Sequence, residues 1–379
     1  METKQNILSK NDQQRFKTFV DNEVIPNANQ FDQAEQIPTE FIAKLAQQGY
    51  LGAILPGKYE GQGMDLITYG RLNEELGRGC ASVRGLMMVQ NMIASTLFKW
   101  GSEVQKEKWL SKIARGEIIA AFALTEPEIG SNAVNISTSL SEEDDSRFII
   151  NGNKRWVTFG QIADLILVFG KIKDKLCAIL LEKETPGLTI KPITGMLGTR
   201  ASMLADLHLD NCSVPQENLV GRIGFGFVPV GLTALNLGRY SIAWGCVGLG
   251  QACLEASLQH VSTRKQFGVH LRKHQLIQKM ITDMVVNIKA ARMLSCQAGE
   301  TQENGESDGI MEIMEAKYFA SKMAFKVANN AVQIHGAIGC SSESVVERHL
   351  RDAKIMEIIE GTSQIHQIKI AEYACRGYK

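Results

Sequence analysis

Two short apolar runs decide the fold: DLILVFGKI at residues 164–172 and KLCAILLEK at residues 175–183. Each run is rich in aliphatic residues and too short for an average helix, and a Lys-Asp pair separates them as a turn would. Similar segments stand at 147–152, 187–193 and 205–215, and in the last of these apolar and polar residues alternate as on a strand. Because no long helix interrupts these segments, they predict an antiparallel sheet.

Helical patterns lie on both sides of this predicted sheet. Apolar residues recur at helical spacing from about residue 10 to residue 120. Long helical stretches follow at 233–264, 276–298 and 310–338, and a last helix is expected from about 363 to 378. We therefore predict an α+β protein with three domains: a helical N-terminal domain at 1–120, a central antiparallel β domain at 121–228 and a C-terminal four-helix bundle at 229–379.

Composition excludes several classes of protein. The 379 residues include 41 Lys+Arg against 41 Asp+Glu, and a neutral chain lacks the basic excess of a nucleic-acid-binding protein. The 44% hydrophobic content argues against disorder. The eight cysteines form no CxxC pair, which argues against a disulfide framework or a metal site. The N-terminus lacks the apolar core of a signal peptide, and no apolar run is long enough to span a membrane. We expect a cytoplasmic protein.

Two pairs of glycines invite a dinucleotide-binding interpretation that their surroundings exclude. The GFG at 224–226 lacks a third glycine, and Pro229 stands where the helix of such a motif should begin. The GLG at 248–250 lies within a helical run, where small residues allow close helix packing. A Rossmann-type NAD enzyme is therefore not expected.

Two segments near the predicted sheet are candidate ligand contacts. FALTEPEIGSNA at 122–133 is a polar turn that either offers backbone N–H groups and hydroxyls to a ligand or is simply a capped turn. In RWVTFG at 155–160, Trp156 and Thr158 would share one face of a strand, where an indole and a hydroxyl suit an aromatic cofactor. An aromatic core residue beside a surface threonine is the structural alternative.

Two segments of the predicted bundle leave similar alternatives open. TRKQFG at 263–268 places Arg264 near a helix break, where a guanidinium suits a phosphate but also a solvated helix end. In QIHGAIG at 333–339, the glycines would let a backbone approach a ligand closely, whereas His335 is equally suited to a core position.

The segment RDAKIMEIIEGTSQI at 351–365 carries the strongest functional signal. Glu360 follows two isoleucines and precedes Gly361, which ends the helix, and Thr362 can cap the next one. A carboxyl group in an apolar loop is desolvated, which raises its pKa and favours a role as general base. The alternative is a helix-junction glutamate paired with an arginine.

Taken together, LTEPxxGS, WVT, RxxFG, QxHGxxG and EGTxQ, in this order, resemble the acyl-CoA dehydrogenase family over essentially the whole chain. The resemblance implies the helix–sheet–bundle fold, FAD bound between subunits of a homodimer or homotetramer, and oxidation of an acyl thioester. The electron acceptor is not indicated by any residue pattern.

The resemblance also implies roles for individual residues. Phe122, Leu124 and Thr125 would contact the flavin ring, Ser131 would lie near FAD or the pantetheine arm, Trp156 would pack on the flavin and Thr158 would bond near N5. Arg264 and Phe267 would reach the FAD of a neighbouring subunit, and Gln275, Gln333, Gly336, Thr362 and Gln364 would complete the nucleotide site. Glu360 matches the general base, which removes a proton from the substrate while flavin N5 takes hydride.

Part of the family carries its base on a bundle helix instead, at a position where this chain has Gly238 in LNLGRY at 235–240. Glycine has no acid group, so Glu360 remains the candidate, and Arg239 would brace the site or orient Glu360.

A narrower resemblance, through GRYSIAWGCVG at 238–248, ADLHLD at 205–210 and AKIMEIIEG at 353–361, points to the subgroup acting on acyl-carrier-protein thioesters in polyketide and hybrid peptide pathways. That subgroup oxidises a small polar acyl group to make hydroxymalonyl, methoxymalonyl or aminomalonyl extender units. The alternatives are a short-chain acyl-CoA dehydrogenase, an oxidase passing electrons to oxygen, and a non-catalytic carrier-binding scaffold.

Overall fold

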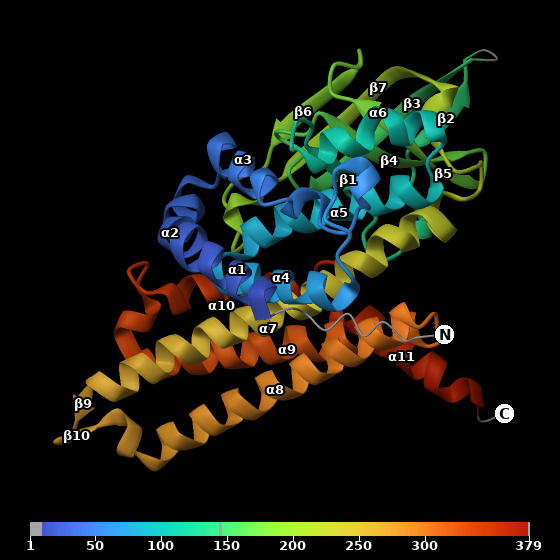
Figure 1. Cartoon of the computed structure of the whole chain (residues 1–379). Helices are drawn as coiled ribbons and strands as arrows, with labels where there is room; N and C mark the ends of the chain where they lie inside the picture. Colours follow the sequence, from blue (N-terminus) through green and yellow to red (C-terminus); the bar gives the residue numbers. More distant parts are fainter. Residues whose placement is uncertain (1–9, 144–145, 378–379) are drawn as a thin grey trace.

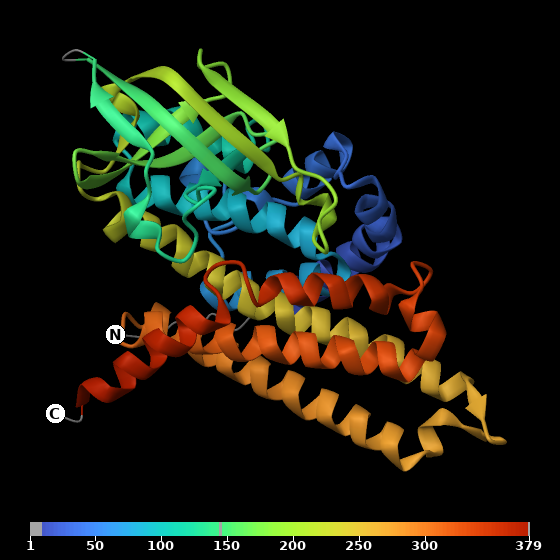
Figure 2. The same cartoon turned by 180° about the vertical axis from the view of Figure 1, so that it is seen from behind.

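The computed structural model describes residues 10–143 and 146–377. Figure 1 shows three parts: short N-terminal helices in blue, a sheet in green, and long helices in yellow to red that run beside one another. The view from behind in Figure 2 shows the sheet and the long helices on opposite sides of the N-terminal helices α4 and α5. The N-terminal helices thus lie between the sheet and the long helices.

The N-terminal part is helical, as its periodicity predicts. Its helices are α1 (Lys10–Phe19), α2 (Ile25–Ala34), α3 (Thr39–Gln47), α4 (Leu66–Gly79), α5 (Ala81–Trp100) and α6 (Glu103–Ala114). Asp65 caps α4 by accepting a hydrogen bond from the backbone N–H of Thr68 at 2.6 Å. Ser102 and Gln105 form a reciprocal capping box at the start of α6. Most of α5 is buried on every side, so it forms the centre of the molecule.

The central part is one sheet with the order β6-β7-β3-β2-β4-β5-β8, and β1 pairs with β4. Its strands are β1 (Ala120–Ala123), β2 (Ser139–Glu142), β3 (Arg147–Val157), β4 (Leu165–Ile172), β5 (Lys175–Glu182), β6 (Leu188–Pro192), β7 (Ala205–Pro215) and β8 (Leu219–Val220). The expected antiparallel pairing holds for β3–β7, β4–β5 and β6–β7. β1 and β2 differ, because both pair in parallel with β4.

Long helices make up the C-terminal part: α7 (Leu232–Thr263), α8 (Gln275–Glu303), α9 (Gly309–His335), α10 (Val345–Met356) and α11 (Ser363–Ala374). A two-stranded hairpin, β9 (Lys265–Gln266) and β10 (Val269–His270), joins α7 to α8 at the far end of the bundle (Figure 1). The prediction of close packing at the GLG segment is confirmed, since a Cβ atom on Gly248 would lie 1.8 Å from the carbonyl oxygen of Glu74 on α4.

A helix that ends before Gly361 was predicted, but its beginning at Val345 was not. The face that α10 buries carries Arg348, His349 and Asp352 together with apolar residues, and this mixture hides the helical period. In the structure Arg348 hydrogen-bonds to the N-terminal helices and Asp352 to the loop between β6 and β7. The ring nitrogens of His349 are buried without a hydrogen-bond partner among the described residues.

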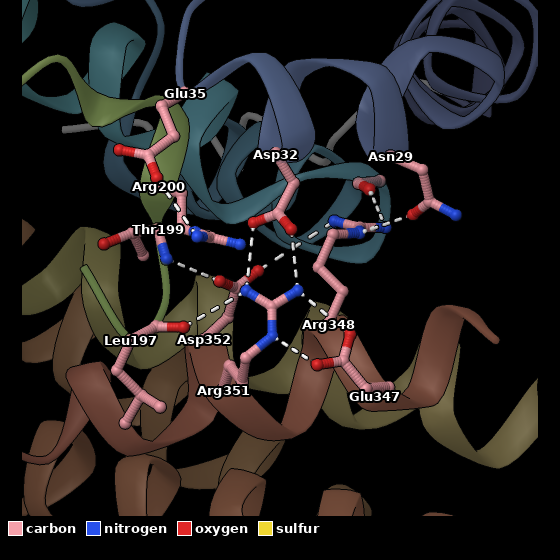
Figure 3. Close-up of polar contacts among 11 residues, drawn as sticks. Asn29, Asp32, Glu35, Leu197, Thr199, Arg200, Glu347, Arg348, Arg351 and Asp352 are labelled. Carbon is pink, nitrogen blue, oxygen red and sulfur yellow. Dashed lines mark hydrogen bonds and ion pairs between the residues drawn. The ribbon is translucent and has the colours of Figure 1, made fainter. Parts of the chain in front are cut away.

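A polar network fixes α10 to the rest of the molecule (Figure 3). Arg351 donates to both carboxylate oxygens of Asp32 on α2, at 3.1 and 2.6 Å, and to the carbonyl oxygen of Leu197 at 3.1 Å. Asp352 accepts from the backbone N–H of Thr199 at 2.6 Å. Arg348 donates to Asn29 at 3.0 Å. The network therefore joins all three parts of the chain at one helix.

None of the helices in residues 10–143 and 146–377 is long and apolar enough to cross a membrane. Within the same residues no cluster of His, Cys, Asp and Glu is arranged to hold a metal ion.

We predict that Arg351→Met lowers the free energy of unfolding by about 2 kcal/mol, because it strips a largely buried charged network of its central donor. Urea denaturation of the purified protein measures this. The control is Lys354→Met on the same helix, whose ion pair with Glu357 is half exposed; it should cost less than about 1 kcal/mol. Equal effects of the two variants would show that the network does not anchor α10.

Candidate active site

The candidate base lies in the short loop between α10 and α11. Glu360 and Gly361 both adopt a positive φ, 54° and 94°, so the chain reverses direction in the left-handed region. Thr362 then caps α11 by accepting a hydrogen bond from the backbone N–H of Ile365 at 3.3 Å. A non-glycine residue in this conformation is strained, and such strain is concentrated at functional sites.

The carboxyl group of Glu360 lies directly over Gly238 on α7. A Cβ atom on Gly238 would come within 2.6 Å of Oε2 of Glu360 and 3.0 Å of the sulfur of Met92 on α5. The space that a side chain at 238 would fill is thus taken by the carboxyl group itself. Oε2 is buried and has no hydrogen-bond partner among the described residues.

Three buried cations surround this carboxyl group. Arg239 donates through Nε to the carbonyl oxygen of Glu360 at 3.3 Å, and Lys317 on α9 donates to that of Gly361 at 2.7 Å. Burial raises the pKa of Glu360 to about 7, and the charges of Arg239, Lys317 and Arg84 partly oppose that rise. A carboxyl group with a pKa near neutrality can accept a proton and later release it.

Arg84 on α5 is the third cation, and only 2% of it is exposed. One of its terminal nitrogens donates to Ser241 Oγ at 2.9 Å and approaches the sulfur of Met88 at 3.2 Å; the other lies 3.9 Å from the sulfur of Met356. It forms no ion pair with any carboxylate of the described residues. Ser241 is three residues beyond Gly238 on α7, or roughly 4.5 Å along the helix axis.

On the sheet side, a buried ion pair shapes the turn at 124–131. Glu126 bonds to Lys154 on β3 at 2.8 Å, and the exposed fraction of the two side chains is 2% and 0%. The carboxylate also accepts from the backbone N–H and hydroxyl groups of Ser137 and Thr138. Burial would raise the pKa of Glu126, but these hydrogen bonds lower it to about 2. The turn is therefore held by a permanent charge.

The residues predicted near a flavin ring are distributed around that turn. Leu124 is buried and accepts, through its carbonyl oxygen, a hydrogen bond from Lys154; the carbonyl oxygen of Thr125 accepts one from the backbone of Arg155. Phe122 on β1 is half-buried and packs on Phe169, with ring centroids 4.8 Å apart. Ser131 is exposed beyond the turn.

Trp156 and Thr158 do not share a strand face in the simple way that their spacing predicts. The pairing of β3 with β7 shifts register between Lys154 and Val157, and Trp156 has a φ of 61°. Strand β3 then ends at Val157, before Thr158. Such an irregularity re-aims a side chain, and here it leaves the indole 44% exposed under the guanidinium of Arg155.

The remaining predicted contacts fall into two groups. Thr362 and Gln364 belong to the Glu360 loop and the first turn of α11. Five others lie at the far end of the bundle, where α7 ends and α8 begins and where α9 ends: Arg264, Phe267, Gln275, Gln333 and Gly336. Stacking of His260 on His335, with centroids 4.4 Å apart, joins the two helix ends there. Phe267 is 94% exposed between β9 and β10. In Figure 1 this hairpin lies at the opposite end of the bundle from α11.

Three family models match the chain in succession: the acyl-CoA dehydrogenase N-terminal domain at residues 10–117, the middle domain at 121–212 and the C-terminal domain at 226–374. The mitochondrial short-chain specific acyl-CoA dehydrogenase of Rattus norvegicus is 36% identical over 372 residues, which are 97% of this chain and 90% of that protein. The chain belongs to the acyl-CoA dehydrogenase family. It is an oxidoreductase that acts on acyl thioesters.

Solved structures of the family superpose closely on this one. A glutaryl-CoA dehydrogenase from Mycobacterium smegmatis in complex with FADH2 has a TM-score of 0.91 at 29% identity, covering 97% of this chain and 94% of that chain. FkbI, for biosynthesis of the methoxymalonyl extender unit of a polyketide, gives 0.87 at 30% identity over 96% and 99% of the two chains. The prolyl acyl carrier protein oxidase AnaB gives 0.89 at 29% identity over 96% and 98%.

Enzymes of the acyl-CoA dehydrogenase family bind FAD, and two features of this chain fit that group. The Trp156 indole stays exposed at an irregular strand end, where an aromatic ring system can stack on it. Backbone and hydroxyl groups of the turn at 124–131 lie beside that strand end, held by the Glu126–Lys154 pair.

Sequence reasoning missed Lys317, Arg84 and the structural role of Glu126. Arg84 and Lys317 are charged residues inside long helical runs, and a charged residue inside a buried helix is the one signal that could have indicated them. Glu126 was recognised as part of a polar turn, but its partner Lys154 lies 28 residues away.

We predict that kcat/KM of the purified enzyme rises with pH through about 7. The pKa of Glu360 is raised, so the proton-accepting carboxylate forms only above that pH, whereas an ordinary glutamate would be ionised from about pH 4–5 upward. Initial rates at saturating electron acceptor between pH 5 and 9 measure this. A rate that is already constant at pH 5.5 would contradict the buried position of the carboxyl group.

We predict that Gly238→Ala lowers kcat about a hundredfold, because the new methyl group would displace the Glu360 carboxyl by about 1 Å or more. Alanine also favours the helix, so the melting temperature should not fall by more than a few degrees. The double variant Gly238→Ala, Glu360→Asp should lose less than the product of the two single losses, since the shorter acid leaves room for the methyl group. Independent losses would show that the two residues do not touch.

Proposed function

We propose that this protein is an FAD-dependent dehydrogenase of a small, polar acyl group, presented as a thioester on an acyl carrier protein. Glu360 is the general base. The alternative is a short-chain acyl-CoA dehydrogenase that forms a 2-enoyl-CoA, and the 36% identity to the rat short-chain enzyme favours that alternative.

The chemistry of the proposal needs a base in a dry site. The thioester carbonyl makes the neighbouring C–H acidic, and Glu360 Oε2, buried and unbonded in the described chain, takes that proton. FAD, when bound, supplies the acceptor for the hydride. Arg239 holds the backbone of Glu360, so the carboxyl group stays aimed over Gly238.

For the cofactor we propose the residues that the family pattern indicates. Those around the sheet turn would contact the flavin end, with Ser131 near FAD or the pantetheine arm: Phe122, Leu124, Thr125, Ser131, Trp156 and Thr158. Thr362 and Gln364, beside the base loop, would help to complete the nucleotide site. At the far end of the bundle, Arg264 and Phe267 would reach the FAD of a neighbouring copy of the chain. Gln275, Gln333 and Gly336 would complete the nucleotide site there.

A homodimer or homotetramer follows from this division of residues. Apolar residues left exposed along α8 support it, with Leu276 75%, Val286 59% and Met293 62% exposed. A cytoplasmic location is part of the proposal and is supported by free thiols at all eight cysteines.

The single observation that carries the polar acyl group is Arg84. A buried guanidinium that forms no direct ion pair is costly, and a ligand that supplies an acceptor would offset that cost. Arg84 contacts Met88, one helical turn before the Met92 that lies beside Gly238, and Ser241, one turn after Gly238. The guanidinium N–H groups of Arg84 thus lie about one helical turn from the carboxyl group of Glu360. This separation suits the end of a short acyl chain rather than a long one.

The carrier protein is supported by the likeness to FkbI and AnaB, at TM-scores of 0.87 and 0.89. AnaB is an oxidase, so oxygen is one candidate electron acceptor for this chain and a flavoprotein is another.

The test compares butyryl and 3-hydroxypropionyl thioesters, each on CoA and on an acyl carrier protein, with the wild type and Arg84→Met. We expect the wild type to prefer the oxygen-bearing group on the carrier protein. Arg84→Met should lose that preference by ten- to a hundredfold, about 1.4–2.7 kcal/mol, while keeping its flavin absorbance. Glu360→Gln should lower kcat by 10²–10⁴-fold.

Equal turnover of butyryl-CoA and of every carrier-bound substrate would favour the short-chain alternative. Hydrogen peroxide released in step with turnover would identify oxygen as the acceptor. A Glu360→Gln variant with full activity would overturn the proposal.

A further inference from the structure

Lys317 is a buried lysine that the chemistry proposed above does not use. It lies in the middle of α9 with 0% of its surface exposed. Its ammonium group donates to the carbonyl oxygen of Gly361 at 2.7 Å, across 44 residues of sequence. It forms no ion pair in the part of the chain that the structure describes. A buried lysine that bonds a backbone carbonyl instead of an acid requires a reason, since its burial is unfavourable.

The base loop supplies that reason. Glu360 and Gly361 are consecutive residues with φ of 54° and 94°, and a left-handed glutamate persists only when its surroundings hold it. Arg239 bonds the carbonyl oxygen of Glu360, and Lys317 bonds that of Gly361. Two cations from two different helices thus hold two successive peptide groups, and together they fix the direction in which the Glu360 side chain leaves the backbone.

The geometry points to Lys317 as a positioning residue: its ammonium group holds the peptide after Glu360 and so keeps the carboxyl group over Gly238 in its proton-accepting orientation. This inference rests on the proposed role of Glu360 as base. The inference gives helix α9 a direct part in placing the base. Among the described residues, Lys317 contacts neither the sheet turn nor the polar network of α10.

The same ammonium group also acts on Glu360 through its charge. The charges that act on Glu360 come from three helices: Arg84 on α5, Arg239 on α7 and Lys317 on α9. His366 on α11 faces the backbone of Glu360. Cys246 on α7 and Glu357 before the loop face Lys317. Removing Lys317 removes one of the cations that oppose the burial-driven rise in the pKa of Glu360. The pH at which the base ionises should therefore move upward.

Three variants separate position from charge. Lys317→Met removes both the hydrogen bond and the charge, Lys317→Gln keeps a donor without charge, and Lys317→Arg keeps both in a different shape. Lys326→Met is the matched control, since Lys326 is exposed on the same helix. Each purified flavin-loaded enzyme is assayed for kcat and KM between pH 5 and 9 and for melting temperature.

For Lys317→Met we expect kcat to fall about a hundredfold with KM changed less than about threefold, because the base moves while the thioester site does not. The rising limb of kcat/KM should move up by about one pH unit. Lys317→Gln should show the shift of the limb with a smaller loss of kcat. Lys317→Arg should recover the wild-type limb, and Lys326→Met should match the wild type.

Lower melting temperature with an unmoved pH limb and unchanged kcat in Lys317→Met would overturn the inference, since a merely structural lysine would behave in that way. Failure of the proposed function gives a different result: the Glu360→Gln variant then stays active, whichever residue is present at position 317. If Lys317→Met does not fold, Lys317→Gln decides in the same way: an unchanged kcat together with an unmoved pH limb overturns the inference.

Discussion

The structure depends on one unfavourable interaction, the burial of the Glu360 carboxyl group against α7 at Gly238, where the helix has no side chain. Glycine at 238 leaves the space for this group. A carboxyl group buried in such a space is tolerated only when cations lie near its ionised form or when it is protonated and neutral. Both conditions hold here, because three cations surround a carboxyl group whose pKa is raised to about 7. The long bundle helices are needed because α7 supplies Arg239 and α9 supplies Lys317 to the same loop.

The same constraint explains why α10 is anchored by charges. The loop that carries the base is attached to the end of α10, so any sliding of that helix would move the carboxyl group. Apolar packing alone resists sliding weakly, because methyl groups have many equivalent contacts. Directional bonds from Arg351 to Asp32 and from Thr199 to Asp352 set one register (Figure 3). Buried polar groups are known to specify register in this way in coiled coils.

The sequence predicts what is local. The helix–sheet–helix order follows from a change of period. Glu360 and Gly361 are visible because their types are chemically unusual in their own segment, whereas Gly238 is noticed only through the resemblance to the family. Contacts that join distant segments are not visible. Lys317 meets its loop across 44 residues and Arg84 meets Met356 across 272. The β1 strand AAFA has weak strand propensity, so its parallel pairing with β4 is set by tertiary contacts. The shift of register at Trp156 likewise depends on β7, not on WVT itself.

The proposed substrate also couples recognition to basicity. The charge of Arg84 lowers the pKa of Glu360. The guanidinium group of Arg84 itself has as acceptors the hydroxyl group of Ser241 and the thioethers of Met88 and Met356. An oxygen-rich acyl group that engages this guanidinium, and above all an anionic one, neutralises part of its field. The pKa of Glu360 then rises further, and the base becomes stronger when the acyl group that it is to deprotonate is in place. An unsubstituted acyl chain would leave the guanidinium without a new acceptor and the base at its resting strength. Discrimination between acyl groups can therefore arise in the proton transfer itself as well as in binding.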